Sequence, residues 1–262
     1  MQKSNTEQRY VIYNLPLHLE LMNATSEPKD IHDLISNGTK YLRSANLPIF
    51  KIENLEICGY ELLIRGTGKF RSPAELFPAA AAVGRLEELD LAALAISLEG
   101  MRELPHNMQI HVNLFAETIL ATDINKLIMV LKQNDKNGAN HSMCVELIET
   151  PIMPRPEDLL LKIRALQNAG IEIAIDDVGC GASSVEVLVL LEPAIFKIDR
   201  NYVTRAYDTP ESRRRYLRLV KIAKSLDCKI VAEGIDTDED RRHAFELGIE
   251  MGQGLLTGPL PQ

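Results

Sequence analysis

Six short apolar segments of the sequence each contain an acidic, amide or amine side chain. In chain order they read GYELLIR, IHVNL, CVELIE, IAIDD, FKID and IVAEG. A charged side chain inside such a segment is costly unless it is paired, hydrogen-bonded or bound to a metal. One acid at a strand end more often caps the following helix, but six such segments in succession indicate one shared site. The polar residues concerned are Glu61, Asn113, Glu146, Asp176, Asp177, Lys197 and Glu233.

The residue types in this set favour a hard divalent cation. Carboxylate and amide oxygens select Mg²⁺ or Mn²⁺ over zinc. The carboxylates are more numerous than one Mg²⁺ usually takes from a protein, so we expect two ions, about 3.5–4 Å apart, that share a bridging Asp. Such sites suit hydrolysis of phosphodiesters or other phosphoesters, with Lys197 orienting the water or offsetting negative charge. A barrel enzyme in which Lys197 is the general base on a carbon acid is a more distant alternative.

The elements that carry these residues follow a regular order. Eight strand-like runs alternate with helix-like segments, which predicts an α/β fold, either a (β/α)₈ barrel or a large doubly wound sheet. Only Glu53–Glu56 separate the first two runs, which permits a hairpin but not a parallel crossover, so a barrel would begin irregularly. The runs are Leu47–Ile52, Ile57–Arg65, Met108–Leu114, Met143–Ile148, Ile171–Asp177, Ala194–Asp199, Cys228–Glu233 and Ile249–Leu255.

Helix boundaries are marked by capping residues. Ser72 opens a capping box with Pro73 at the first helical position. A helix is predicted over Pro156–Ala169, with Gly170 as its left-handed stop, and another begins after Thr237. Residues 1–38 stand apart as an N-terminal extension of unknown role, with a possible strand at Tyr10–Met22. A further helix is predicted at Lys29–Arg43.

Composition restricts the class of protein. The 262 residues carry a net charge of −8, which argues against a nucleic-acid polymer as the main partner. There is no run of 18 apolar residues and no secretory signal at the N-terminus, so we expect a cytoplasmic protein without a membrane partner. The four cysteines form no CxxC pair and predict buried, reduced thiols. The six histidines show no metal or catalytic spacing, and a structural role is expected for each.

The segments together resemble the EAL-domain cyclic di-GMP phosphodiesterases. Residues 61–65, Glu-Leu-Leu-Ile-Arg, are similar to the signature Glu-Ala-Leu-x-Arg, and the resemblance extends over residues 39–262. It continues through residues 111–114 (HVNL), 145–149 (VELIE), 175–181 (IDDVGCG), 196–199 (FKID), 231–237 (VAEGIDT) and 252–254 (GQG). Any one of these motifs is weak evidence, whereas the ordered combination is specific.

The resemblance implies a TIM-like (β/α)₈ barrel with an irregular, antiparallel first strand and a homodimer. It implies hydrolysis of one phosphodiester bond of cyclic di-GMP to linear pGpG, which lowers this second messenger in bacterial signalling. By the same resemblance, Glu61, Asn113, Glu146 and Asp176 hold one metal, and Asp176, Asp177 and Glu233 the second. Glu61, Lys197 and Glu233 are the catalytic residues. The implied substrate-side residues are Leu63, Arg65, Asn113, Asp199, Asp236 and Gln253.

Departures from the family pattern leave an alternative open. The loop after the Asp pair usually reads Phe-Gly-Thr-Gly-Tyr, and here it is Val178-Gly179-Cys180-Gly181-Ala182. Losing two aromatic rings and a hydroxyl beside the metal ligands predicts slow turnover. The rival hypothesis is therefore a degenerate EAL domain that acts as a cyclic di-GMP receptor or a protein-interaction module without turnover.

Overall fold

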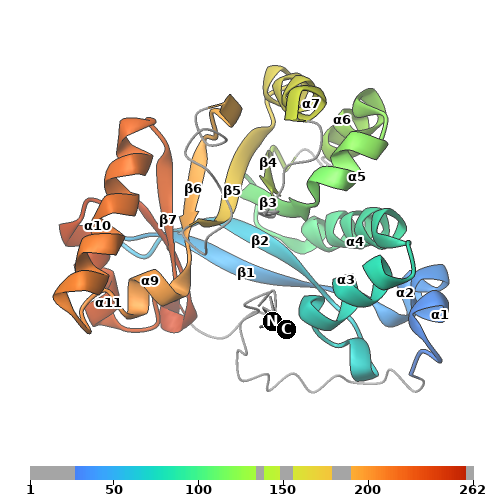
Figure 1. Cartoon of the computed structure of the whole chain (residues 1–262), viewed down its shortest axis with the longest axis horizontal. Coiled ribbons are helices and arrows are strands. Elements are labelled where there is room, and N and C mark those ends of the chain that lie inside the picture. The colour runs from blue at the N-terminus through green and yellow to red at the C-terminus, as the bar shows by residue number, and fades with distance from the viewer. Residues whose placement is uncertain (1–26, 134–138, 148–155, 179–189, 258–262) are drawn as a thin grey trace, which may run out of the picture.

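The eight strands of the computed structural model form a closed barrel, surrounded by helices (Figure 1). The structure describes residues 27–133, 139–147, 156–178 and 190–257. The expected strand at Tyr10–Met22 and the loop at 179–182 lie outside these residues. The strands are β1 (Arg43–Lys51), β2 (Ile57–Arg65), β3 (Gln109–Leu114), β4 (Ser142–Leu147), β5 (Glu172–Val178), β6 (Ile195–Ile198), β7 (Lys229–Glu233) and β8 (Met251–Gln253).

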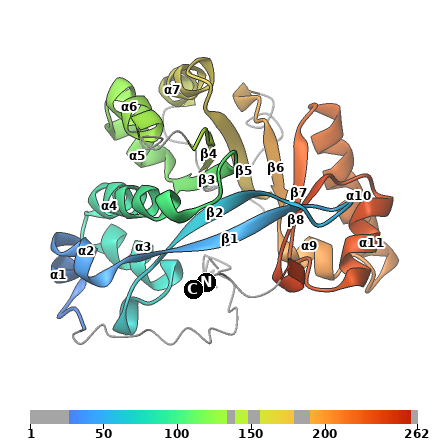
Figure 2. The ribbon, with the colours of Figure 1, turned by 180° about the vertical axis from the view of Figure 1, so that it is seen from behind.

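The predicted irregular first strand is confirmed. Strand β1 runs antiparallel to both of its neighbours, β2 and β8, whereas β2 to β8 are parallel to one another. A tight turn joins β1 to β2: the Leu55 amide donates to the Lys51 carbonyl, and Leu55 takes a positive φ of 61°. Figure 2 shows β1 and β2 as a long two-stranded hairpin that crosses the molecule. The carboxyl ends of β2 to β8 therefore share one mouth of the barrel with the amino end of β1.

The helices begin and end close to the expected capping residues. Ser72 and Thr237 both form capping boxes, and Gly170 follows α7 with a φ of +80°. Among the described residues, no helix is long and apolar enough to cross a membrane. The α-helices are α1 (Ile31–Ser36), α2 (Gly38–Tyr41), α3 (Pro73–Ala82), α4 (Leu86–Gly100), α5 (Ala116–Ala121), α6 (Ile124–Gln133), α7 (Pro156–Asn168), α9 (Arg200–Thr204), α10 (Pro210–Ser225) and α11 (Asp238–Glu246).

One predicted helix is wrong. The segment expected as a single helix over Lys29–Arg43 forms two short helices, α1 and α2, which are separated at Asn37. The Asn37 side chain donates to the carbonyl and the carboxylate of Asp33, so it competes with continuation of the helix. Arg43 already belongs to β1, which begins four residues before the expected Leu47 because its residues Arg43–Phe50 pair with β2.

Alternation along the strands divides the core into two parts. One face of each strand points outward and packs under the helices, with residues such as Phe50, Val112 and Phe196. The other face points into the barrel, where an apolar layer closes its centre. This interior layer consists of Ile49, Cys144, Ala174, Ile195, Val231 and Met251. The polar residues at the carboxyl ends of the strands therefore lie on top of an apolar plug.

A buried acid ties two helices together beside the barrel. Asp90 of α4 is 1% exposed and accepts a hydrogen bond of 3.0 Å from the Phe115 amide, just before α5. Burial raises the pKa of Asp90 to about 7. Between the ordinary pKa of an aspartate and pH 7, the folded protein thus holds a proton that the unfolded chain releases, and stability falls as the pH rises through this window.

Replacing Asp90 by asparagine is expected to remove this pH dependence. The variant should gain about 2 kcal/mol relative to the wild type between pH 5 and pH 8, because its amide never ionises. Urea unfolding of both proteins at the two pH values measures the difference. A stability difference that stays the same at both values would show that Asp90 is not the group responsible.

Candidate active site

The alternation of the strands brings the predicted residues together at one mouth of the barrel. Asn113 is paired in register with Glu146, and Glu233 with Gln253, so neighbouring strands present side chains at the same level. Because β2 to β8 run in the same direction, the interior positions near their carboxyl ends converge on the barrel axis. Six residues of the predicted set, together with Gln253, meet there. They are Glu61, Asn113, Glu146, Asp176, Lys197, Glu233 and Gln253.

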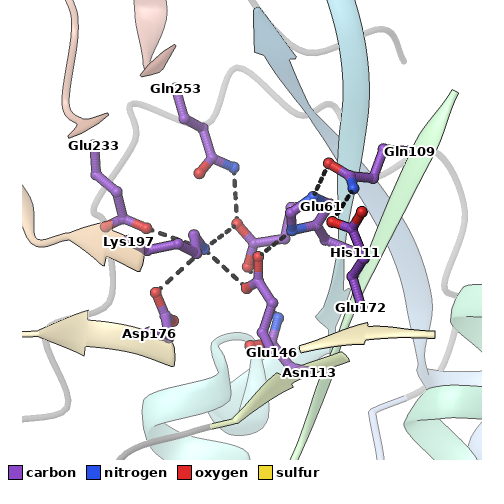
Figure 3. A network of polar contacts seen from close by, with 10 residues as sticks. All are labelled: Glu61, Gln109, His111, Asn113, Glu146, Glu172, Asp176, Lys197, Glu233 and Gln253. Carbon is purple, nitrogen blue, oxygen red and sulfur yellow. Dashed lines mark hydrogen bonds and ion pairs between the residues drawn. The ribbon is translucent and has the colours of Figure 1, made fainter. Parts of the chain in front are cut away.

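The ammonium of Lys197 lies at the centre of this cluster (Figure 3). Its Nζ is 2.8 Å from Glu146 Oε2, 3.0 Å from Glu233 Oε1, 3.1 Å from Glu61 Oε2 and 3.2 Å from Asp176 Oδ1. The Lys197 side chain is 1% exposed, and Asp176 is the only one of the four acids with an appreciable exposed fraction, 18%. One buried ammonium therefore contacts four carboxylates.

The charges in the cluster are strongly coupled. Burial alone would lower the pKa of Lys197, but the surrounding carboxylates outweigh it and raise this pKa. Burial would also raise the pKa of Glu61, yet the ammonium and hydrogen bonds from Asn113 and Gln253 hold it at about 2. Burial and the negative charge of Glu61 raise the pKa of Glu146 well above its usual range. Four acidic groups thus surround one ammonium, and Glu146 is the one whose neutral form is favoured.

Hydrogen bonds orient Glu61 toward the centre. Asn113 Nδ2 donates to Glu61 Oε1 at 2.9 Å, and Gln253 Nε2 donates to Glu61 Oε2 at 2.7 Å. The amide of Gln253 therefore orders the site from β8, across the barrel opening from Asn113. Asn113 and Gln253 thus both lie beside Glu61 in the structure.

The donor chemistry of the cluster fits a divalent metal. Four carboxylates and the side-chain oxygen of Asn113 form a hard oxygen set, which Mg²⁺ and Mn²⁺ prefer. Asp176 Oδ1 is buried and accepts no hydrogen bond, although it lies within ion-pair distance of Lys197. In the described part of the chain, no group of three acidic, histidine or cysteine side chains is already arranged to hold a metal ion. The four acidic side chains of the cluster point instead at the ammonium of Lys197. A metal would compete with Lys197 for the same oxygens.

The remaining predicted residues lie at the rim or carry other contacts. Leu63 and Arg65 are half-buried and follow Glu61 on the same face of β2. Asp199 is buried and accepts a hydrogen bond from the Asn201 amide, which caps α9. Asp177 belongs to β5, and its side chain lies outside what the structure describes.

A small hollow at the rim contains Asp236. Its carboxylate is paired with Arg200 and also accepts from the Leu255 amide at 2.9 Å. Arg200, Glu233, Asp236 and Gln253 line this hollow. Arg200 directly follows the FKID segment, and the sequence interpretation did not include it. Its position directly after the polar end of that segment, as the first residue of α9 at the mouth that carries the cluster, is a signal that could have found it.

The sequence interpretation also missed His111. Its Nδ1 lies 2.7 Å from Glu146 Oε1, and both side chains are fully buried. Burial, with a contribution from the charge of Lys197, lowers the pKa of His111 to about 3. The segment Gln109-Ile110-His111-Val112-Asn113-Leu114 alternates strictly between polar and apolar residues. This period of two places His111 on the same face as Asn113, and it could have identified the residue.

Comparisons with known proteins agree with the geometry. The chain is 31% identical over 215 residues to a probable cyclic di-GMP phosphodiesterase, PdeB of Escherichia coli, covering 80% of this chain and 40% of the relative. It is 28% identical over 244 residues to an uncharacterized protein of Azorhizobium caulinodans, covering 87% of this chain and 32% of that protein. The chain thus spans about a third of the length of such curated relatives.

Solved structures share the fold. A complex of the MucR phosphodiesterase with c-di-GMP superposes with a TM-score of 0.73 at 25% identity, covering 84% of this chain and 96% of that one. A manganese and c-di-GMP complex of Klebsiella pneumoniae BlrP1 gives a TM-score of 0.71 at 26% identity, covering 82% and 55%. The family model described as the EAL domain matches residues 38–259. The chain therefore belongs to the EAL domain family.

Proposed function

We propose that the protein hydrolyses one phosphodiester bond of cyclic di-GMP to linear pGpG in a reaction that depends on Mg²⁺ or Mn²⁺. The observation that carries the proposal is the set of four acidic side chains, three of them buried, which outnumber the single ammonium of Lys197 and converge on it at one mouth of the barrel. Relatives named as cyclic di-GMP phosphodiesterases and a manganese complex of a neighbour support it.

The proposed ligands are the residues that the sequence predicts. Glu61, Asn113, Glu146 and Asp176 would hold one ion, and Asp176, Asp177 and Glu233 a second. Bound there, divalent ions supply Lewis-acid chemistry, which activates water and stabilises charge on the phosphate.

Side chains of the protein itself would position the water, the metal ligands and the substrate phosphate. Lys197 provides a positive charge at the centre of the cluster, where it can orient a water or offset charge on the phosphate. Gln253 and Asn113 fix the orientation of Glu61 through their hydrogen bonds. Arg65, at the end of β2, would bind a substrate phosphate. Leu63, Asp199 and Asp236 remain predicted substrate-side residues.

The test of the proposal is a hydrolysis assay with defined metals. Purified protein stripped with chelator should be inactive on cyclic di-GMP and should release pGpG when Mg²⁺ or Mn²⁺ is added. Ca²⁺ should not support turnover and should inhibit, because its larger radius and looser coordination spoil the spacing of ions around a shared Asp176. Chromatographic separation of cyclic di-GMP, pGpG and GMP measures the product.

Each outcome of this assay separates the candidate functions. Full activity in excess chelator, or equal rates with Ca²⁺, would contradict the metal-dependent reaction. Tight binding of cyclic di-GMP with no pGpG under any metal would support the receptor without turnover, which the unusual residues 178–182 favour. A homodimer and a cytoplasmic location are further predictions, and light scattering of the purified protein measures the first of them.

A further inference from the structure

A chain of hydrogen bonds crosses the interior of the barrel from the catalytic cluster to the opposite mouth (Figure 3). Glu146 Oε1 contacts His111 Nδ1 at 2.7 Å, and His111 Nε2 contacts Gln109 Oε1 at 3.1 Å. Gln109 Nε2 then donates to Glu172 Oε2 at 2.8 Å. Lys229 lies 3.6 Å from the other oxygen of Glu172.

The chain passes through a layer that is otherwise apolar. Gln109 and His111 are alternate residues of β3, as are His111 and Asn113, so all three face the barrel interior. At the level of His111 the interior is closed by side chains such as Cys144, which is its register partner on β4. A fully buried imidazole in this layer is costly unless both of its nitrogens have partners. The structure supplies both partners.

The direction of the hydrogen bonds follows from the chemistry at the far end. An ionised Glu172 only accepts, so the amide of Gln109 turns its Nε2 toward Glu172 and its oxygen toward His111. His111 Nε2 therefore carries a hydrogen and donates to Gln109. The neutral ring then has a lone pair on Nδ1, so the hydrogen in the contact with Glu146 Oε1 belongs to the carboxyl group of Glu146, whose pKa is raised. The ring is thus fixed in one orientation, with Nδ1 accepting from Glu146 and the other carboxyl oxygen, Oε2, facing the cluster.

The two oxygens of the Glu146 carboxyl group have different partners. Its Oε1 is engaged by His111, and its Oε2 lies 2.8 Å from Lys197 at the centre of the cluster. We propose that His111, anchored by Gln109 and Glu172, is a positioning residue that fixes Glu146 so that Oε2 faces the cation position. This inference rests on the proposed metal site, and it adds residues that the set of ligands does not contain.

The expected effect is on metal affinity. Hydrogen-bond partners behind a ligand typically contribute about 10–100-fold to metal affinity, because they fix its orientation and charge. Replacing His111 by leucine should weaken Mn²⁺ binding by about this factor. His111→Asn should recover part of the loss, because the asparagine amide places a polar atom near the position of Nδ1. Gln109→Leu, which touches neither Glu146 nor Lys197, should weaken binding less than His111→Leu does.

The experiment is calorimetric titration of the metal-free full-length protein with Mn²⁺, without substrate, alongside thermal unfolding. Cys144→Ala is the matched control, because it creates a small cavity in the same buried layer without entering the hydrogen-bond chain. A merely structural role for His111 would lower the unfolding temperature of the variants but leave their Mn²⁺ affinity equal to that of Cys144→Ala.

The outcomes distinguish this inference from the proposed function. Weaker Mn²⁺ binding in the His111 and Gln109 variants, with Cys144→Ala like the wild type, supports the positioning role. If His111→Leu does not fold, Gln109→Leu and His111→Asn decide. Wild-type affinity in both would overturn the inference while leaving the metal site intact. If the wild type itself binds no Mn²⁺, the proposed metal site fails, and the positioning role fails with it.

Discussion

Replacing Glu61 by glutamine is expected to reduce hydrolysis of cyclic di-GMP by more than about a hundredfold, because partners behind a metal ligand already contribute up to that factor and Glu61 is a proposed ligand itself. The glutamine side chain keeps the shape of Glu61 but loses its charge. It also brings an amide group toward the donors of Asn113, Lys197 and Gln253, which now have one acceptor fewer. The measurement is the initial rate of pGpG release with saturating Mn²⁺.

A matched control comes from the same hairpin. Glu56→Gln changes a glutamate that pairs with Lys51 at the opposite end of the barrel, and 58% of its side chain is exposed. This variant should release pGpG at the wild-type rate, since the exposed pair lies away from the cluster and also contributes little to stability. Wild-type turnover in Glu61→Gln, with the protein folded, would be incompatible with the role assigned to Glu61.

Replacing Lys197 by methionine is expected to cause the largest loss of stability. Removing one partner of a buried ionic cluster costs about 3–5 kcal/mol, because the other charges stay buried without compensation. For a chain of this length the unfolding temperature should fall by roughly 6–20 °C in the presence of chelator. Mn²⁺ should restore much of this loss, since a divalent ion replaces the missing positive charge among the same carboxylates. Hydrolysis should remain low even with the metal bound.

Lys162→Met provides the comparison for this experiment. The Lys162 ammonium donates to the carbonyls of Ile119, Leu120 and Thr122 at the end of α5, outside the carboxylate cluster. This variant should also unfold at a lower temperature, but Mn²⁺ should raise its unfolding temperature no more than it raises that of the wild type. Thermal unfolding followed by circular dichroism, with chelator and with Mn²⁺, measures all three proteins. Equal responses to Mn²⁺ would show that Lys197 is not the counter-ion of the cluster.

The positions of the strands could be predicted because their chemistry is periodic. An apolar run with a polar residue at its carboxyl end marks β3 to β7, and the four-residue gap between the first two runs excluded a parallel crossover. Local capping chemistry marked α3 and α11 as well. The helix predicted at Lys29–Arg43 was wrong in part because Arg43 belongs to β1, whose residues Arg43–Phe50 pair with β2. Local helix propensity contains no information about this long-range pairing.

The arrangement inside the site could be predicted only in part. The sequence indicated which side chains share the mouth of the barrel, but not that the Lys197 ammonium would contact four acids at once. This contact depends on the reach of side chains across the closed barrel. His111 was missed because its neighbours in sequence offered no metal or catalytic spacing. Its partner Glu146 belongs to another strand, 35 residues away.

The reversed direction of β1 also decides where a fused module would sit. In a regular barrel of parallel strands the chain enters at the amino-terminal mouth, and the catalytic loops lie at the other end. Here β1 begins at the mouth that carries the cluster, where Arg43 pairs with Arg65, and the preceding helices α1 and α2 share an apolar core with Ile64. A sensory or regulatory module joined before residue 43 would therefore be attached at the same mouth as the cluster, at the end of the β1–β2 hairpin that extends four residues beyond the Leu47–Glu61 pair. Movement of that junction would act first on the end of β2 that carries Arg65, the residue predicted to bind a substrate phosphate.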